Sequence, residues 1–223
     1  MSSQQTTAKG VVIAVINQKG GAGKSSTSIH LADWLRTKQK QQVLLIDSDP
    51  QRSSELWVKA MAEPIPLIAM ESPDDLLEKM SDLSEQYDYV IVDGPAKLSE
   101  STRAILLGAD LALIPVQPTG LDLHSAYDAI RLVKQAQKVR GKLPQAAVFL
   151  SRAIKGTNLK DETLKALAAV PEVSALKTPI HQRQVIADAF GQGATVFSMA
   201  GRSAADSARE YAQLFDEMME LLP

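Results

Sequence analysis

The stretch with the most evident chemistry runs from Val11 to Thr27 and reads VVIAVINQKGGAGKSST. It opens with a short run of apolar and β-branched residues, Val11–Ile16, which is typical of a fully buried strand. Three glycines, a lysine and two serines follow, and then apolar residues recur at helical spacing. Such a loop lets backbone N–H groups surround an anion, and the positive end of the helix favours the same charge. The layout predicts a phosphate-binding loop.

The residue types in this loop indicate individual roles. Lys24 is expected to reach the terminal phosphates of a nucleotide, and the Ser25 hydroxyl is expected to ligate Mg²⁺. The alternative is a glycine-rich turn with chance lysines, but the strand-to-helix context favours phosphate binding. The remaining candidates for nucleotide contact are the neighbouring loop residues Gly20, Gly21, Ala22, Gly23 and Ser26.

Carboxylates follow two other apolar runs. Val43–Ile46 leads into Asp47 and Asp49, and Tyr87–Val92 leads into Asp93. Open α/β sheets bind ligands outside the carboxyl ends of their strands. We expect Asp93 to hold Mg²⁺, through water, because Mg²⁺ dehydrates reluctantly. For Asp47 and Asp49 the alternative is that one of the two only caps the helix that follows.

The rest of the chain alternates apolar runs with amphipathic segments, which predicts a doubly wound, mostly parallel α/β sheet flanked by helices. We expect a disordered tail over residues 1–9 and one domain over residues 10–223. Further strands are predicted over Ile65–Met70, Ala109–Val116, Gln145–Leu150 and Val173–Thr178. Helices are predicted over Ser53–Met61, Ser72–Leu83, Leu121–Val139, Lys160–Val170 and Ser203–Leu222, the last with an apolar stripe that packs on the sheet.

Composition narrows the function classes. The chain has 223 residues, no cysteine and a formal net charge of −2. Disulfides and thiolate metal sites, including cysteine-ligated iron–sulfur clusters, are therefore excluded, and any binding of nucleic acid must come from a local basic patch. No apolar run approaches the ~20 residues of a membrane span, and the polar start does not resemble a signal peptide. We expect a cytoplasmic protein that does not bind membranes.

The loop departs from the ordinary P-loop pattern, because Gln18 stands where a glycine is expected and Lys19 precedes the glycines. The string K-G-G-x-G-K-S resembles the deviant Walker A box of the ParA/MinD family of ATPases. The D-x-D-P-Q string at Asp47–Gln51 and the strand that ends at Asp93 resemble the family's second and third boxes. The likeness extends from about Val11 to Leu222.

This resemblance implies that the protein binds ATP and Mg²⁺, hydrolyses ATP slowly and forms a homodimer around the nucleotide. Lys19 would then act catalytically by reaching the phosphates of the opposite subunit, while Asp49 would position the attacking water. Asp47 would support the Mg²⁺ shell. The segment around Pro179 resembles the family's adenine-side segment, although the Asn expected after the strand at Gln145–Leu150 is missing, so recognition of the base stays open.

Among family members, the chain most resembles small ParA-type ATPases, because it lacks the N-terminal helix-turn-helix domain of longer relatives. This implies an ATP-bound dimer that coats nucleoid DNA non-specifically and is released when a cargo adaptor protein stimulates hydrolysis. The cargo could be a plasmid, a chromosome region or a large protein assembly, so that partition, segregation and positioning are all possible roles. Basic candidates for DNA contact lie in the last third of the chain: Lys155, Lys160, Lys165, Lys177, Arg183, Arg202 and Arg209.

Two other functions stay open. A MinD-like membrane ATPase would end in a basic amphipathic helix, but the end of this chain carries Asp216, Glu217 and Glu220 and, from Tyr211 on, no lysine or arginine. Anionic lipid would repel such an end. A metabolic P-loop ligase or kinase would need a substrate pocket, and the sequence identifies none.

Overall fold

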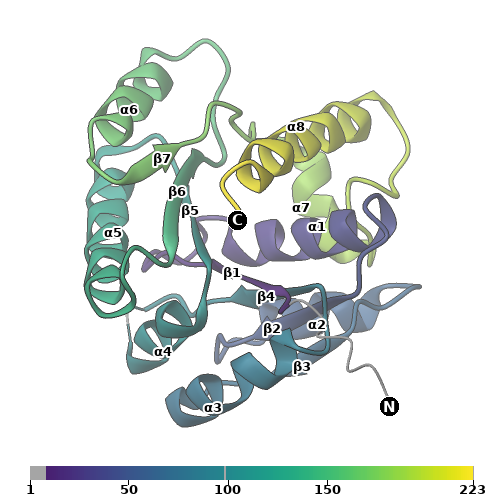
Figure 1. The fold of residues 1–223 in the computed structure, drawn as a ribbon. Coiled ribbons are helices and arrows are strands. Elements are labelled where there is room, and N and C mark those ends of the chain that lie inside the picture. The colour runs from purple at the N-terminus through teal and green to yellow at the C-terminus, as the bar shows by residue number, and fades with distance from the viewer. Residues whose placement is uncertain (1–8, 98, 223) are drawn as a thin grey trace.

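The computed structural model describes residues 9–97 and 99–222, apart from the side chains of Asn158, Lys160 and Asp161. At its centre lies a seven-stranded sheet with the order β3-β2-β4-β1-β5-β6-β7, in which all the paired strands run parallel (Figure 1). This confirms the predicted doubly wound α/β fold. The strands are β1 (Val11–Val15), β2 (Val43–Asp47), β3 (Leu67–Ala69), β4 (Tyr89–Asp93), β5 (Leu111–Val116), β6 (Gln145–Leu150) and β7 (Val173–Ala175).

Helices cover both faces of the sheet, because the central strands are apolar at nearly every position and successive side chains point to opposite sides. One hydrophobic cluster joins the sheet to α3 (Pro73–Ser84), α4 (Glu100–Gly108), α5 (Gly120–Arg140) and α6 (Asn158–Ala168). The other joins it to α1 (Lys24–Thr37), α2 (Ser53–Ala60), α7 (Gln184–Gly191) and α8 (Arg202–Met219). Figure 1 shows α1, α7 and α8 together on one side of the strands.

The register of the central strands places the three predicted boxes at one edge. Val15, the last residue of β1, lies opposite Asp93 of β4, and Asp93 lies opposite Asp47 of β2. Because all three strands run parallel, the loops that follow them leave the sheet on the same side. The fold therefore gathers the glycine loop and the carboxylates at one place.

Two helices were not predicted from the sequence. Helix α4 is short and begins with a capping box, in which the Ser99 hydroxyl accepts from the Thr102 N–H and the Thr102 hydroxyl accepts from the Ser99 N–H. Helix α7 has only eight residues, too few for a clear apolar period. The predicted tail lies, except for Lys9, outside the described residues.

The last helix packs as its apolar stripe predicted. Leu214, Phe215 and Met218 of α8 are buried in the cluster that also contains strand residues Leu113 and Phe149. Within the described part of the chain, no helix combines the length and apolarity needed to cross a bilayer.

Candidate functional site

The glycine loop between β1 and α1 is held open by its neighbours. Gly21 and Gly23 both have positive φ, 76° and 100°, a conformation that glycine adopts without strain. The Ser151 hydroxyl at the end of β6 donates to the Ala22 carbonyl at 2.6 Å. The Gln117 amide, just beyond β5, donates to the Gly21 carbonyl at 2.8 Å. Because these two carbonyls are bonded to residues outside the loop, the backbone N–H groups from Gly20 to the first turn of α1 are available to an anion, whereas the Lys19 N–H is bonded to Asn17.

The start of the loop is braced by a buried asparagine. The Asn17 amide group donates to the Pro115 carbonyl at 2.7 Å, and its side-chain oxygen accepts from the Lys19 N–H at 3.0 Å. Asn17 therefore fixes the direction in which the chain leaves β1. The sequence suggested no role for this residue.

Lys24 is the cation of the loop. Its side chain is buried, with 6% of the residue exposed, and its ammonium donates to the Lys19 carbonyl at 3.3 Å. Burial lowers the pKa of Lys24, while the charges of Asp93 and Asp49 act in the opposite direction. A buried cation that has no carboxylate within ion-pair distance among the described residues favours the arrival of an anion, in line with the role predicted for this lysine.

Asp93 lies fully buried at the end of β4. It accepts from the Ser54 hydroxyl at 2.7 Å and from the Ser28 hydroxyl at 3.3 Å, and the Ser25 side chain favours its charged form. Burial raises the pKa of Asp93 to about 6. Carboxylate and hydroxyl oxygens are hard donors of the kind that Mg²⁺ takes, so Ser25 and Asp93 fit the predicted metal role.

The two carboxylates after β2 have different surroundings. Asp47 accepts from the backbone N–H groups of Asp49, at 3.1 Å, and Glu55, at 2.9 Å, and burial raises its pKa. Because Glu55 is in the first turn of α2, Asp47 caps that helix, which is the structural alternative considered for one of this pair. Asp49 instead accepts from the N–H groups of Gln51 and Ala96 and so reaches the loop after β4.

Lys19 does not point into its own loop. Its ammonium lies 2.6 Å from a carboxylate oxygen of Asp122, in the first turn of α5, and the side chain of Asp122 is fully buried. Thr119, the N-cap of α5, also bonds to Asp122 through its hydroxyl. Asp122 was not predicted as a site residue, because 103 positions separate it from Lys19.

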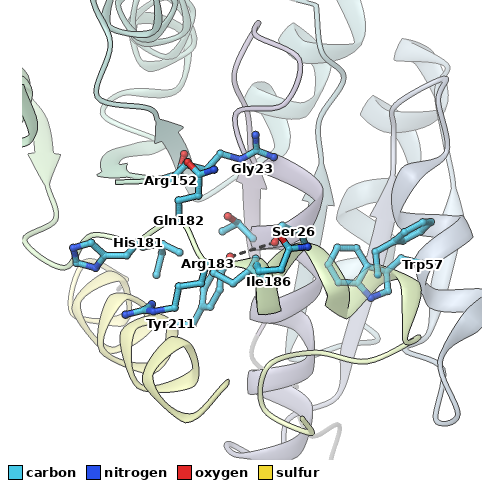
Figure 2. A pocket seen from close by; sticks show the side chains of 15 residues that line it. Gly23, Ser26, Trp57, Arg152, His181, Gln182, Arg183, Ile186 and Tyr211 are labelled. Carbon is cyan, nitrogen blue, oxygen red and sulfur yellow. Dashed lines mark hydrogen bonds between the residues drawn. The ribbon is translucent and has the colours of Figure 1, made fainter. Parts of the chain in front are cut away.

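A cavity of about 320 Å³ opens beside the loop and beneath the segment that joins β7 to α7 (Figure 2). Gly23, Ser26 and Thr27 form one wall, and Ile180–Gln184 form another. Pro179, the predicted base contact, is outside the lining but immediately precedes it. The other lining residues come from α2, α7, α8 and the end of β6: Trp57, Ser151, Arg152, Ile186, Ala187, Phe190 and Tyr211.

Tyr211 of α8 has a second contact besides packing. Its hydroxyl lies 3.2 Å from the Ser26 hydroxyl at the start of α1, and burial raises its pKa to about 12. The apolar spacing of the last helix predicted that the Tyr211 ring is buried. It could not indicate this hydrogen bond, because Ser26 is 185 positions away in the sequence.

The basic residues predicted for DNA contact do not form one exposed set. The Arg183 side chain is only 13% exposed, and its guanidinium makes two hydrogen bonds to Glu210, at 2.5 and 2.6 Å, so it is not presented as a free cation. Arg209 is exposed but pairs with Asp206 at 3.3 Å. The Lys160 side chain lies outside the described residues. The other candidates, Lys155, Lys165, Lys177 and Arg202, are exposed.

Comparison with known proteins agrees with this geometry. Residues 13–196 match the model of the CobQ/CobB/MinD/ParA nucleotide binding domain. Maintenance of carboxysome distribution protein A from Halothiobacillus neapolitanus is 31% identical over 95% of this chain and 97% of its own. An ATP complex of a Cyanothece McdA variant superposes with a TM-score of 0.79 at 16% identity, over 96% and 98% of the two chains. Cobyrinic acid a,c-diamide synthase from Mycobacterium smegmatis with ADP and magnesium gives 0.69 at 19% identity, over 96% and 98%. The chain belongs to the CobQ/CobB/MinD/ParA family of nucleotide-binding domains.

Proposed function

We propose that this protein is a ParA-type, Mg²⁺-dependent ATP hydrolase that dimerises around ATP and positions or segregates a large cargo. The main support for the proposal is that Lys24, Asp49 and Asp93 lie close together beyond the carboxyl ends of the adjacent strands β1, β2 and β4. A phosphate loop with a buried lysine and a carboxylate beside a hydroxyl is the arrangement that P-loop hydrolases use for a nucleotide and Mg²⁺. Ser25 and Asp93 would hold the Mg²⁺ ion, and the ion would withdraw negative charge from the phosphates.

Asp49 is the residue best placed to orient the attacking water. Its carboxylate sits at the border of the site, 8% exposed, and its contact with the Ala96 N–H links it to the loop that follows Asp93. Phosphoryl transfer depends on positioning and charge more than on base strength, so a fixed carboxylate is sufficient for this role.

The dimer is supported by the region around Lys19. Its side chain is 36% exposed and its ammonium pairs with Asp122 of α5, while Leu121, next to Asp122, is 80% exposed. An exposed leucine beside a cation is suited to contact a second copy of the chain. On closure, Lys19 would stabilise the charge that develops on the phosphates of the opposite subunit.

The proposed role in positioning a cargo is supported by sequence similarity to proteins with such a role. The carboxysome-distribution protein matches over nearly all of both chains, which favours a large protein body as cargo, with plasmid or chromosome as the other candidates. We propose that the ATP-bound dimer binds nucleoid DNA non-specifically in the cytoplasm and that a cargo adaptor stimulates hydrolysis. Lys155, Lys165, Lys177 and Arg202 are the exposed residues for this contact.

The MinD-like alternative, binding to a membrane, is disfavoured by α8. The apolar face of this helix, with Leu214 and Phe215, is buried in the core, and Glu217 accepts hydrogen bonds from Lys177 and Thr178. A membrane-binding helix would need that face free and a basic polar face. Pelleting with anionic liposomes in the presence of ATP distinguishes the two: the parent protein should stay in the supernatant.

The first experiment measures nucleotide binding and mass together. Calorimetry with Mg-ATP and Mg-ADP should show binding of both, and light scattering should show a dimer with ATP alone. Lys24→Ala should abolish binding, whereas Lys19→Ala should spare binding and lose stimulated hydrolysis. A parent protein that binds no ATP, or stays monomeric with ATP at every concentration, contradicts the proposal.

Two further measurements separate the DNA-bound ATPase from a metabolic ligase. The affinity for non-specific DNA should require ATP and fall steeply with added salt, since Lys and Arg contacts displace counterions from the phosphates. A ligase would instead turn over steadily without DNA or a partner protein. Salt-independent DNA binding, or full turnover in isolation, would favour the rival.

A further inference from the structure

The cavity beside the phosphate loop has polar lining side chains, but most of them are already engaged within the protein. The Ser26 hydroxyl bonds to Tyr211, and the Ser151 hydroxyl donates to Ala22. His181 and Arg183 both bond to Glu210. Gln184 donates to Asp188 at 2.8 Å.

Arg152 and Gln182 are the two long polar side chains of this lining that form no hydrogen bond or ion pair with described residues. Figure 2 shows them near each other at the end of the cavity where Gly23 lies, with Trp57 at a distance. Both side chains belong to exposed residues. They are therefore the lining groups most available to one.

The backbone holds Arg152 in an unusual conformation. Its φ is 51°, in the left-handed region that a residue with a side chain seldom adopts. Hydrogen bonds on both sides impose it: the Ser151 N–H donates to Val116, and the Ala153 N–H donates to Ile180 at 3.0 Å. Strained residues that the surrounding structure fixes in this way occur preferentially at ligand sites. The Arg152 charge also acts on Tyr211, where it opposes the larger effect of burial on the pKa of the phenol.

The cavity is continuous with the phosphate loop, since Gly23 and Ser26 line it. A nucleotide whose terminal phosphates rest on Lys24 would therefore extend its sugar and base into this space. Its apolar lining, from Ile180 and Ile186 to Phe190, suits the flat face of a base. Among the described residues that line it there is no Asn, the residue that the family resemblance led us to expect for base recognition.

We propose that Arg152 and Gln182 take over this recognition: Arg152 binds the α-phosphate and ribose side of the nucleotide, and Gln182 reads the Watson–Crick edge of adenine. The inference rests on the proposed function, because it assumes that a nucleoside triphosphate occupies the loop. A guanidinium beside a phosphate loop is suited to a phosphate oxygen. A primary amide offers one acceptor and one donor, which complement the N6–H and N1 of adenine.

The chemistry of Gln182 gives a direct test. Guanine presents two donors on the same edge, N1–H and N2–H, and a carboxylate accepts from both. Gln182→Glu should therefore lower the ratio of the GTP to the ATP dissociation constant at least tenfold. The matched control is Gln184→Glu, which adds the same charge to the same lining at a glutamine already bonded to Asp188.

Arg152 is tested with nucleotide diphosphate and triphosphate in parallel. Arg152→Ala should weaken Mg-ADP and Mg-ATP by the same factor, roughly ten- to hundredfold, because a charge-assisted contact is lost from the part they share. Arg152→Lys should be intermediate, since it keeps the charge without the planar fork. Arg103→Ala, an exposed arginine on α4, should change neither constant.

The results distinguish a failure of the proposed function from a failure of the roles assigned to Arg152 and Gln182. If the parent binds neither nucleotide, the proposed function fails. If the parent binds both and Arg152→Ala keeps the parent constants, the assignment of Arg152 is wrong. If Gln182→Glu leaves the base preference unchanged, or Gln184→Glu shifts it equally, the assignment of Gln182 is wrong. Circular dichroism of each variant confirms that a weaker affinity is not due to unfolding.

Discussion

His30, in the middle of α1, is a buried titratable group behind the phosphate loop. Its Nδ1 lies 2.6 Å from the Ser26 carbonyl, and its Nε2 lies 3.2 Å from the Val196 N–H. Since the Val196 N–H can only donate, Nε2 must accept and the ring hydrogen is on Nδ1. The ring also stacks on Tyr211, with centroids 4.4 Å apart. Protonation would place a second donor against the Val196 N–H, inside the core.

The size of this effect follows from the pKa. Burial lowers the pKa of His30 from 6.5 to about 4, against weaker opposing effects of the Ser26 hydrogen bond and the Asp33 charge. Between these two values the unfolded chain binds more protons than the native one, so stability falls as the pH falls. From pH 7.5 to pH 4.5 this group alone should lower the free energy of unfolding by about 2.5 kcal/mol.

The assay is urea unfolding of the nucleotide-free protein at both pH values. His30→Gln is the variant to compare, because its amide can still donate to Ser26 and accept from Val196. The parent should lose about 2.5 kcal/mol more than this variant on acidification, since the other groups are common to both. His124→Gln, an exposed histidine on α5, should lose as much as the parent. Equal losses in parent and His30→Gln would refute the reasoning.

Three other expectations follow from the site. Asp49→Ala should still bind ATP but hydrolyse it at under about a tenth of the parent rate and accumulate as a dimer; phosphate release and light scattering measure both. Asp122→Asn should lower the ATP concentration needed for dimerisation about fivefold, because releasing Lys19 from a partly exposed ion pair costs about 1 kcal/mol; unchanged titrations would contradict this. Arg183→Ala should lower the free energy of unfolding by about 2 kcal/mol, since it leaves Glu210 half-buried without its cation, with no loss of DNA binding; a weaker affinity for DNA would restore Arg183 to the contact surface.

The layout of the sheet could be predicted because its central strands are signalled locally. A run such as Val11–Val15 must be covered on both faces, and the segments between such runs are long enough for crossover helices. Edge strands were less clear: β3 and β7 have three residues each, so the predicted runs Ile65–Met70 and Val173–Thr178 are too long. An edge strand pairs with one neighbour only, and the length of that pairing limits the length of the strand. The hydrophobic pattern of the sequence does not reveal this limit.

The phosphate loop was predictable for the same reason, since its glycines, lysine and serines are contiguous. The partners of those residues were not. Asp122 is one polar residue among several in a helical pattern, and only the fold brings it to Lys19. Arg183 looked available because its partner Glu210 lies in α8, 27 positions away. Charged residues can be counted from a sequence, whereas their pairing depends on tertiary contacts.

The ion pair between Lys19 and Asp122 offers a reason why a single chain would hydrolyse ATP slowly. Each copy supplies one buried cation, Lys24, to its own loop, while Lys19 is committed to Asp122. The exchange of that carboxylate for a partner's phosphate is close to balanced, because one charge-assisted contact replaces another. In the proposed dimer, additional contacts, including any made by Leu121, would therefore have to provide the free energy that favours closure. Hydrolysis per subunit should then rise with protein concentration, and a rate that is independent of concentration would show that one chain completes the site alone.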